Sequence, residues 1–146
     1  MKFLLNRYFI IQLLLSMVHA QVFEGYTLFT PSSTNEDGAS TILMDNEYNA
    51  VHSWTHVLLP ASMPYLLQDS SLVYPYKVPN PTMFSGGVGG GIQQINWHGD
   101  VLWDYQIANN EYQHHHDIEP LPNGNILILA WNRKTAEETY LSGRDT

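Results

Sequence analysis

Short apolar segments dominate this sequence between residues 26 and 131, and clusters of Gly, Pro, Asn and Asp separate them. None of the segments continues with the 3.6-residue periodicity of an amphipathic helix. The segments that we expect to be strands are 26–29, 41–44, 50–54, 65–67, 72–74, 92–96, 101–105, 118–121 and 125–131. This pattern predicts an all-β fold of short antiparallel strands, and the segment 135–141 fits either a short helix or a loop.

A unit of two hairpins recurs along the chain. The hairpin Leu43–Trp54 has the same order of strand, polar turn and strand ending in Trp as Gln93–Trp103, at an offset of 50 residues. The hairpin Leu67–Val73 matches Leu121–Leu127 at an offset of 54 residues, and the second of these turns contains Asn-Gly, a strong hairpin signal. Four strands in roughly fifty residues is the size of one β-propeller blade. The alternative is a chance likeness between generic hairpins.

The repeat, together with an apolar leader, divides the chain into four parts. They are a signal peptide (1–20), an N-terminal strand and loop (21–40), two four-stranded antiparallel blades (41–134) and a polar tail (135–146). Closing a propeller ring takes at least about four blades, and two blades alone leave exposed strand edges. We therefore expect a partial β-propeller, the front part of a longer protein whose further blades follow the tail.

The first residues have the pattern of an export signal. Lys2 and Arg7 flank the short apolar run Phe9–Val18, which is too short to span a bilayer. Val18-His19-Ala20 places compact residues before an expected cleavage after Ala20. This predicts a secreted or periplasmic protein with no membrane contact after cleavage, and an uncleaved membrane anchor is the alternative.

The charge balance and the missing cysteines exclude several classes of function. Fourteen acidic residues against six basic ones give a net charge of −8, which argues against a nucleic acid or an anionic membrane as partner. The sequence contains no Cys, so disulfides, thiolate metal sites and Cys nucleophiles are all excluded.

A run of three histidines and an aspartate, His114 to Asp117, is the main candidate for chemistry. A neutral imidazole near pH 7 can act as a nucleophile or donate a hydrogen bond, and an adjacent carboxylate can hold one ring in a fixed tautomer. Strand alternation would place His114 and His116 on one face, and His115 with Asp117 on the other. Spacing alone does not decide which ring faces a site.

Four motifs, in this order, resemble the N-terminal part of the arylsulfotransferase family. They are His52-Ser53-Trp54 after a Leu-Met-Asp strand, Tyr65-Leu66-Leu67, the strand pair from Gly91 to Tyr105, and His115-His116-Asp117-Ile118 followed by Leu121–Leu127. The resemblance runs from about Gly25 to about Lys134, and the ordered series is more specific than any single motif.

The resemblance implies a six-bladed propeller that transfers a sulfuryl group from a phenolic sulfate ester to a phenol acceptor. It implies a covalent histidine intermediate and no nucleotide donor. We expect no cofactor and no metal. The family's nucleophilic histidine and its arginine lie in later blades, and this chain shows no counterpart of them. The family pattern favours His115 and His116 as catalytic residues, with Asp117 orienting a ring.

Other interpretations of the same residues stay open. One alternative is that the three histidines are exposed loop residues. Another is that they bind zinc, although their spacing does not complete a set of zinc ligands. The whole chain also fits a non-catalytic secreted propeller that binds a protein or a glycan. Elsewhere we expect His52 and His56 to be structural, the four tryptophans to pack between blades, and the glycine-rich segment 86–91 to be a flexible connection.

Overall fold

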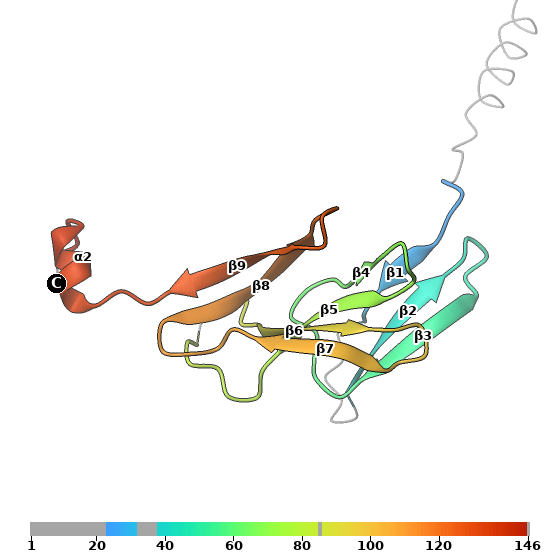
Figure 1. Ribbon diagram of the computed structural model, residues 1–146, viewed down its shortest axis with the longest axis horizontal. Helices are drawn as coiled ribbons and strands as arrows, with labels where there is room; N and C mark the ends of the chain where they lie inside the picture. The colour runs from blue at the N-terminus through green and yellow to red at the C-terminus, as the bar shows by residue number, and fades with distance from the viewer. Residues whose placement is uncertain (1–22, 32–37, 85, 146) are drawn as a thin grey trace, which may run out of the picture.

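The computed structural model describes residues 23–31, 38–84 and 86–145 (Figure 1). The predicted signal peptide and its cleavage position lie outside them, as does part of the predicted segment 21–40. In the part that is described, no helix is long and apolar enough to cross a membrane. The strands are β1 (Thr27–Phe29), β2 (Ala39–Met44), β3 (Ala50–His56), β4 (Tyr65–Leu66), β5 (Leu72–Lys77), β6 (Gly90–Ile95), β7 (Val101–Gln106), β8 (Tyr112–Pro120) and β9 (Ile126–Asn132), followed by the helix α2 (Ala136–Leu141).

The strands form three small antiparallel sheets, so the all-β prediction is confirmed as a mostly β fold. Their orders are β1-β2-β3, β4-β5-β6-β7 and β8-β9. The middle sheet is a four-stranded meander, which is the strand arrangement of a propeller blade. The closed six-bladed ring stays a prediction.

The sheets group the predicted hairpins differently from the repeat. The β4–β5 hairpin pairs with the β6–β7 hairpin, through a β5–β6 ladder that runs from Leu72↔Ile95 to Lys77↔Gly90. The repeat predicts instead that the β4–β5 hairpin joins the β2–β3 hairpin. A sequence period shows how long a repeated unit is, but not where along the chain one sheet ends and the next begins. Pro75 lies within β5, paired with Ile92, whereas its sequence position at the start of the proline-rich stretch 75–81 predicts a connection.

The β2–β3 and β6–β7 hairpins close with the same turn. The backbone N–H of Asp45 donates to the carbonyl of Asn49 (3.0 Å), and that of Asn96 donates to the carbonyl of Asp100 (2.9 Å). In both turns the first side chain accepts from the N–H of the last residue, at 2.8 Å and 2.9 Å respectively. The hydrogen bonds therefore match Asp45 to Asn96, an offset of 51 residues, and the expected offset of 50 was one residue too short. The offset of 54 for the other hairpin pair is confirmed, because Leu67 and Leu121 make equivalent turn bonds.

Two apolar cores cover the two faces of the middle sheet, which Figure 1 shows between the other two sheets. The larger core joins it to the β1–β3 sheet and contains Leu43, Trp54, Leu72, Tyr74, Tyr76, Val78 and Ile95. The smaller core joins it to β8 and contains Val73, Ile92 and Ile118. Successive residues of β5 thus contribute to opposite cores, as strand alternation requires.

Hydrogen bonds also tie β3 to the turn after β6. The indole N–H of Trp54 donates to the carbonyl of Asn96 (3.0 Å), and Nε2 of His52 donates to the carbonyl of Trp97 (2.8 Å). The rings of His52 and Trp97 stack with centroids 3.8 Å apart. These contacts confirm the structural role expected for His52 and the packing role expected for Trp54. Trp103 and Trp131 belong to neither core, contrary to expectation.

His56 is a buried histidine of the larger interface. Its Nε2 is hydrogen-bonded to Oγ1 of Thr41 (2.8 Å), and its ring stacks on Tyr74 with centroids 3.7 Å apart. Burial lowers the pKa of His56 to about 4, because the charged imidazolium is poorly solvated there. The structural role expected for this residue is confirmed.

The matched turns predict opposite effects of glycine at two positions. Tyr48 has φ = 65° and is exposed, and its counterpart Gly99 has φ = 93°. Since left-handed backbone costs an L-residue roughly 1–2 kcal/mol and glycine little, Tyr48→Gly should raise the free energy of unfolding by about 0.5–1 kcal/mol. Gly99→Ala should lower it by a similar amount. Urea denaturation of both variants measures this, and a loss of stability in Tyr48→Gly would contradict the turn assignment.

The burial of His56 predicts an acid-sensitive stability. Below pH 6.5 the unfolded chain protonates this histidine, whereas the folded chain does so only near pH 4, so the free energy of unfolding should fall across that range by a few kcal/mol. Denaturation curves between pH 7 and pH 4 test this. His56→Gln should flatten the pH dependence, and the exposed His98→Gln should leave it unchanged; equal slopes in both variants would exclude His56 as the cause.

Candidate functional site

The histidine triplet lies at a bulge in β8. The β8–β9 register runs from Tyr112↔Asn132 to His114↔Ala130 and resumes only at Ile118↔Ile128, so extra residues of β8 stand opposite one residue of β9. His116 has φ = 44°, a left-handed conformation that is uncommon for any residue other than glycine. Bulges of this kind re-aim side chains and are frequent beside active sites.

The bulge brings the rings of His115 and His116 together. Strand alternation predicted opposite faces for these two residues, and this was wrong, because the left-handed turn at His116 interrupts the alternation. Their Nδ1 atoms are 2.6 Å apart, and their ring centroids are 4.5 Å apart at an interplanar angle of 68°. The ring of Trp131 packs against His115 in a T-shaped arrangement, with centroids 4.3 Å apart.

The hydrogen bonds assign the tautomers of this imidazole pair. Nδ1 of His116 lies 2.8 Å from the carbonyl oxygen of His115, and because a carbonyl only accepts, this Nδ1 carries a proton. The same proton faces Nδ1 of His115, which therefore accepts. In the neutral pair the proton of His115 is then on Nε2, and Nε2 of His116 carries a lone pair. The pair offers one donor and one acceptor.

His114 anchors the start of the bulge. Its side chain is fully buried, and its Nδ1 accepts a hydrogen bond from the N–H of Gly90 (3.0 Å). Burial lowers the pKa of His114, Asp117 raises it, and the two neighbouring imidazoles lower it further. His114 is therefore a neutral residue with its proton on Nε2, which has no hydrogen-bond partner within the described ranges.

The glycine-rich segment, predicted to be a flexible connection, packs against the histidines. Val88 forms a β-bridge with His115, and the N–H of Gly89 donates to the carbonyl of His114 (3.1 Å). A Cβ at Gly87 would lie 2.8 Å from Cε1 of His115, and one at Gly89 would collide with Nδ1 of His114. Glycine is needed here because only a backbone without side chains can approach the imidazoles this closely. The cluster of glycines itself was the signal in the sequence that pointed to this close approach.

Asp117 lies at the end of the bulge and is exposed. Its carboxylate accepts from the N–H of Ile118 (3.1 Å), and no hydrogen bond to an imidazole is present among the described residues. The carbonyl of His115 makes the orienting contact that sequence analysis assigned to this carboxylate. Within the described ranges, no group of three or more His, Asp or Glu side chains is arranged to hold a metal ion.

The glycine contacts predict that Gly89 and Gly86 differ sharply in their tolerance of a methyl group. Gly89→Ala should displace His114 and lower the free energy of unfolding by about 1–3 kcal/mol, as overpacking of a buried site does. Gly86→Ala should change it by less than about 0.5 kcal/mol, because nothing lies within 4 Å of an added Cβ there. Thermal unfolding of both variants is the measurement, and equal stability would show that the glycine segment does not hold His114.

Comparison with known proteins places this geometry in a family. The sequence pattern of the family described as arylsulfotransferase (ASST) matches residues 65–146, which include the middle sheet, the glycine-rich segment and the histidine triplet. No curated protein and no solved structure matches the chain. Since the match covers more than half of the sequence, the chain belongs to the arylsulfotransferase family, whose name implies enzymes that act on aryl sulfates.

Proposed function

We propose that this protein transfers a sulfuryl group from a phenolic sulfate ester to a phenol, without a nucleotide donor and through a covalent histidine intermediate. His115 and His116 belong to the transfer site in this proposal, and the histidine that carries the sulfuryl group lies in a later part of the protein. Membership of the arylsulfotransferase family supports the reaction class. The geometry of the imidazole pair supports the choice of residues.

The observation that carries the proposal is the fixed tautomer of the imidazole pair. Sulfuryl transfer needs a hydrogen-bond donor for oxygens that gain charge, and an acid or base for the proton of the phenol. Nε2–H of His115 serves as the donor to a sulfuryl oxygen. Nε2 of His116 takes the proton of the acceptor phenol, and in the reverse sense it returns a proton to the departing phenolate of the donor.

Asp117 has an electrostatic role in this proposal. A carboxylate that directly follows His116 stabilises the positive charge that the imidazole pair gains when it takes up a proton. This role requires no hydrogen bond to a ring. Removal of the charge should therefore affect the rate less than removal of either imidazole.

We also propose that the protein acts outside the cytoplasm, on the basis of the apolar leader 1–20. The mass of the exported protein tests cleavage after Ala20.

The role of His116 predicts a defined loss of activity. In the protein produced from the complete open reading frame, His116→Ala should slow transfer from 4-nitrophenyl sulfate to phenol at least tenfold, equivalent to about 1.4 kcal/mol. His116→Gly tolerates the positive φ without strain, so its loss of activity reports the missing ring alone. Added imidazole should restore part of the rate in His116→Gly.

The controls separate this role from a structural one. His115→Ala shows what the donor contributes, and His98→Ala, in the exposed turn before β7, should leave the rate unchanged. Full activity of His116→Ala would remove this residue from the site. Absence of transfer by the unmodified protein would favour the alternative, a secreted propeller that binds a protein or a glycan.

A further inference from the structure

A cavity of about 520 Å³ lies beside the candidate site, between strands that are far apart in the sequence. Its walls come from four strands and the segments before two of them. Tyr26 precedes β1, Leu28 lies in β1 and Leu43 lies in β2. Met63 precedes β4, Tyr65 begins β4 and Asp117 lies in β8. Its volume is within the range of about 300–1,000 Å³ that is usual for small-molecule sites. The cavity is therefore large enough for a substituted aromatic ring.

The walls of the cavity are apolar and aromatic, and their charge is negative. Asp117 is the one charged side chain among the described residues that line it. A second carboxylate stands next to the wall, since the hydroxyl of Tyr65 donates to Glu119 (3.3 Å). The pKa of Tyr65 is raised by burial, by the charge and hydrogen bond of Glu119, and by the charge of Asp117. The two negative charges therefore act at the ring that lines the cavity.

The cavity and the imidazole pair meet at one point of the chain. Asp117 directly follows His116, and the Cα atoms of consecutive residues are about 3.8 Å apart. Asp117 therefore belongs both to the wall of the cavity and to the bulge that carries the two imidazoles.

We propose that this cavity binds the aryl ring of the acceptor, and that its carboxylates select phenols whose ring substituent is neutral or cationic over phenols whose substituent is anionic. The aromatic walls supply the contact with the ring, as tyrosine side chains do in many binding sites. Asp117 and Glu119 attract a cationic substituent and repel an anionic one through their negative charges. This selectivity rests on the sulfuryl-transfer function proposed above.

Binding of three phenols that differ in charge tests the selectivity. The probes are 4-ethylphenol, the cationic 4-(2-aminoethyl)phenol and the anionic 3-(4-hydroxyphenyl)propanoate, with affinity measured by calorimetry or by ligand-detected NMR at neutral pH. The cationic probe should bind roughly fivefold or more tightly than the anionic one. Asp117→Asn should bring the two affinities within about twofold of each other. Equal affinities in the unmodified protein, or an unchanged preference in Asp117→Asn, would overturn the selectivity.

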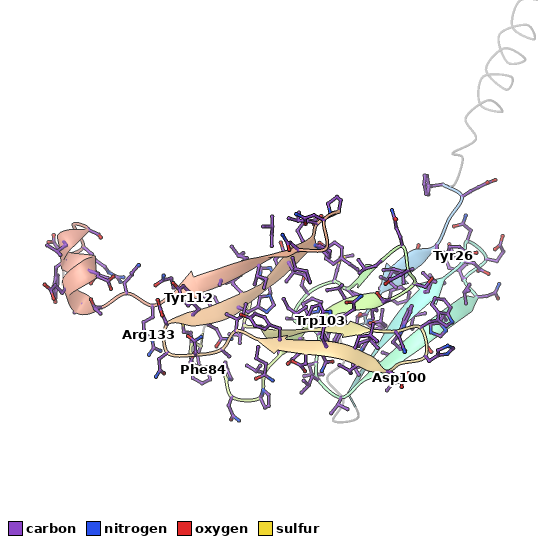
Figure 2. The ribbon with its side chains drawn as sticks, in the orientation of Figure 1. Tyr26, Phe84, Asp100, Trp103, Tyr112 and Arg133 are labelled. Atoms are coloured by element: carbon purple, nitrogen blue, oxygen red, sulfur yellow. The ribbon has the colours of Figure 1, made fainter. Side chains whose placement is uncertain are left out.

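A matched pair of tyrosine variants tests the location. Tyr26 is 67% exposed and lines this cavity, whereas Tyr105 on β7 is 58% exposed and lines another apolar cavity together with Ile92 and Trp103. Figure 2 shows Tyr26 beside β1 and Trp103 on β7, at separate places on the molecule. Tyr26→Ala should weaken binding of all three phenols by roughly three- to tenfold, and Tyr105→Ala should not change it. The reverse result would place the aryl site on β7.

The same measurements separate this proposal from the proposed function. Binding of phenols does not depend on turnover. Charge-selective binding without transfer from 4-nitrophenyl sulfate would therefore support the phenol-binding cavity and contradict the proposed enzymatic function. If the protein catalyses transfer and Tyr26→Ala leaves the KM for the acceptor phenol unchanged, the enzymatic function would be supported and the proposed aryl-binding role of the cavity contradicted.

Discussion

Burial of both faces of the middle sheet is the constraint on which the rest of this structure depends. In β5, Leu72, Tyr74 and Tyr76 point into the core shared with the β1–β3 sheet, and Val73 points into the core shared with β8. A strand in this position needs apolar residues at consecutive positions, and β5 is buried along nearly its whole length. Both neighbouring sheets pack against this strand, one on each face, which is the packing order of blades in a propeller.

That packing determines the shape of the histidine site. β8 is anchored on one side of the bulge by His114, which is buried against Gly90, and on the other side by Ile118 in the smaller core. Between these two anchors the backbone has more residues than the ladder to β9 needs, and the excess forms the left-handed turn at His116. Such a turn costs an L-residue roughly 1–2 kcal/mol, and strain of this kind is characteristic of functional sites.

The turn also explains how adjacent residues can act together. On a regular strand, consecutive side chains point to opposite faces and cannot contact each other. The bulge lets His115 and His116 share one proton contact while leaving one Nε2 as a donor and the other as an acceptor. The apolar cavity then begins at the very next residue, Asp117, so the imidazole pair and one wall residue of the cavity belong to the same short segment of β8.

Local interactions explain what the sequence by itself determined about this protein. The hairpins were predictable because each turn is closed by bonds within five residues, such as those between Asp45 and Asn49. The family was predictable because its motifs are contiguous, and the pattern match covers most of the same residues. The one-residue error in the first repeat offset arose because Tyr48 occupies a positive φ position that its counterpart fills with glycine, so residue identity did not mark the equivalence.

Tertiary structure alone decided the features that depend on contacts between distant residues. The four-strand grouping depends on which hairpin pairs with β5 through its ladder to β6, and no local signal encodes that choice. The contact of His115 with His116 depends on a bulge defined by the partner strand β9. The role of the glycine segment depends on the contact of Gly89 with His114, which lies twenty-five positions further along the chain. Glycine is needed there because the imidazole of His114 occupies the space that a Cβ would fill.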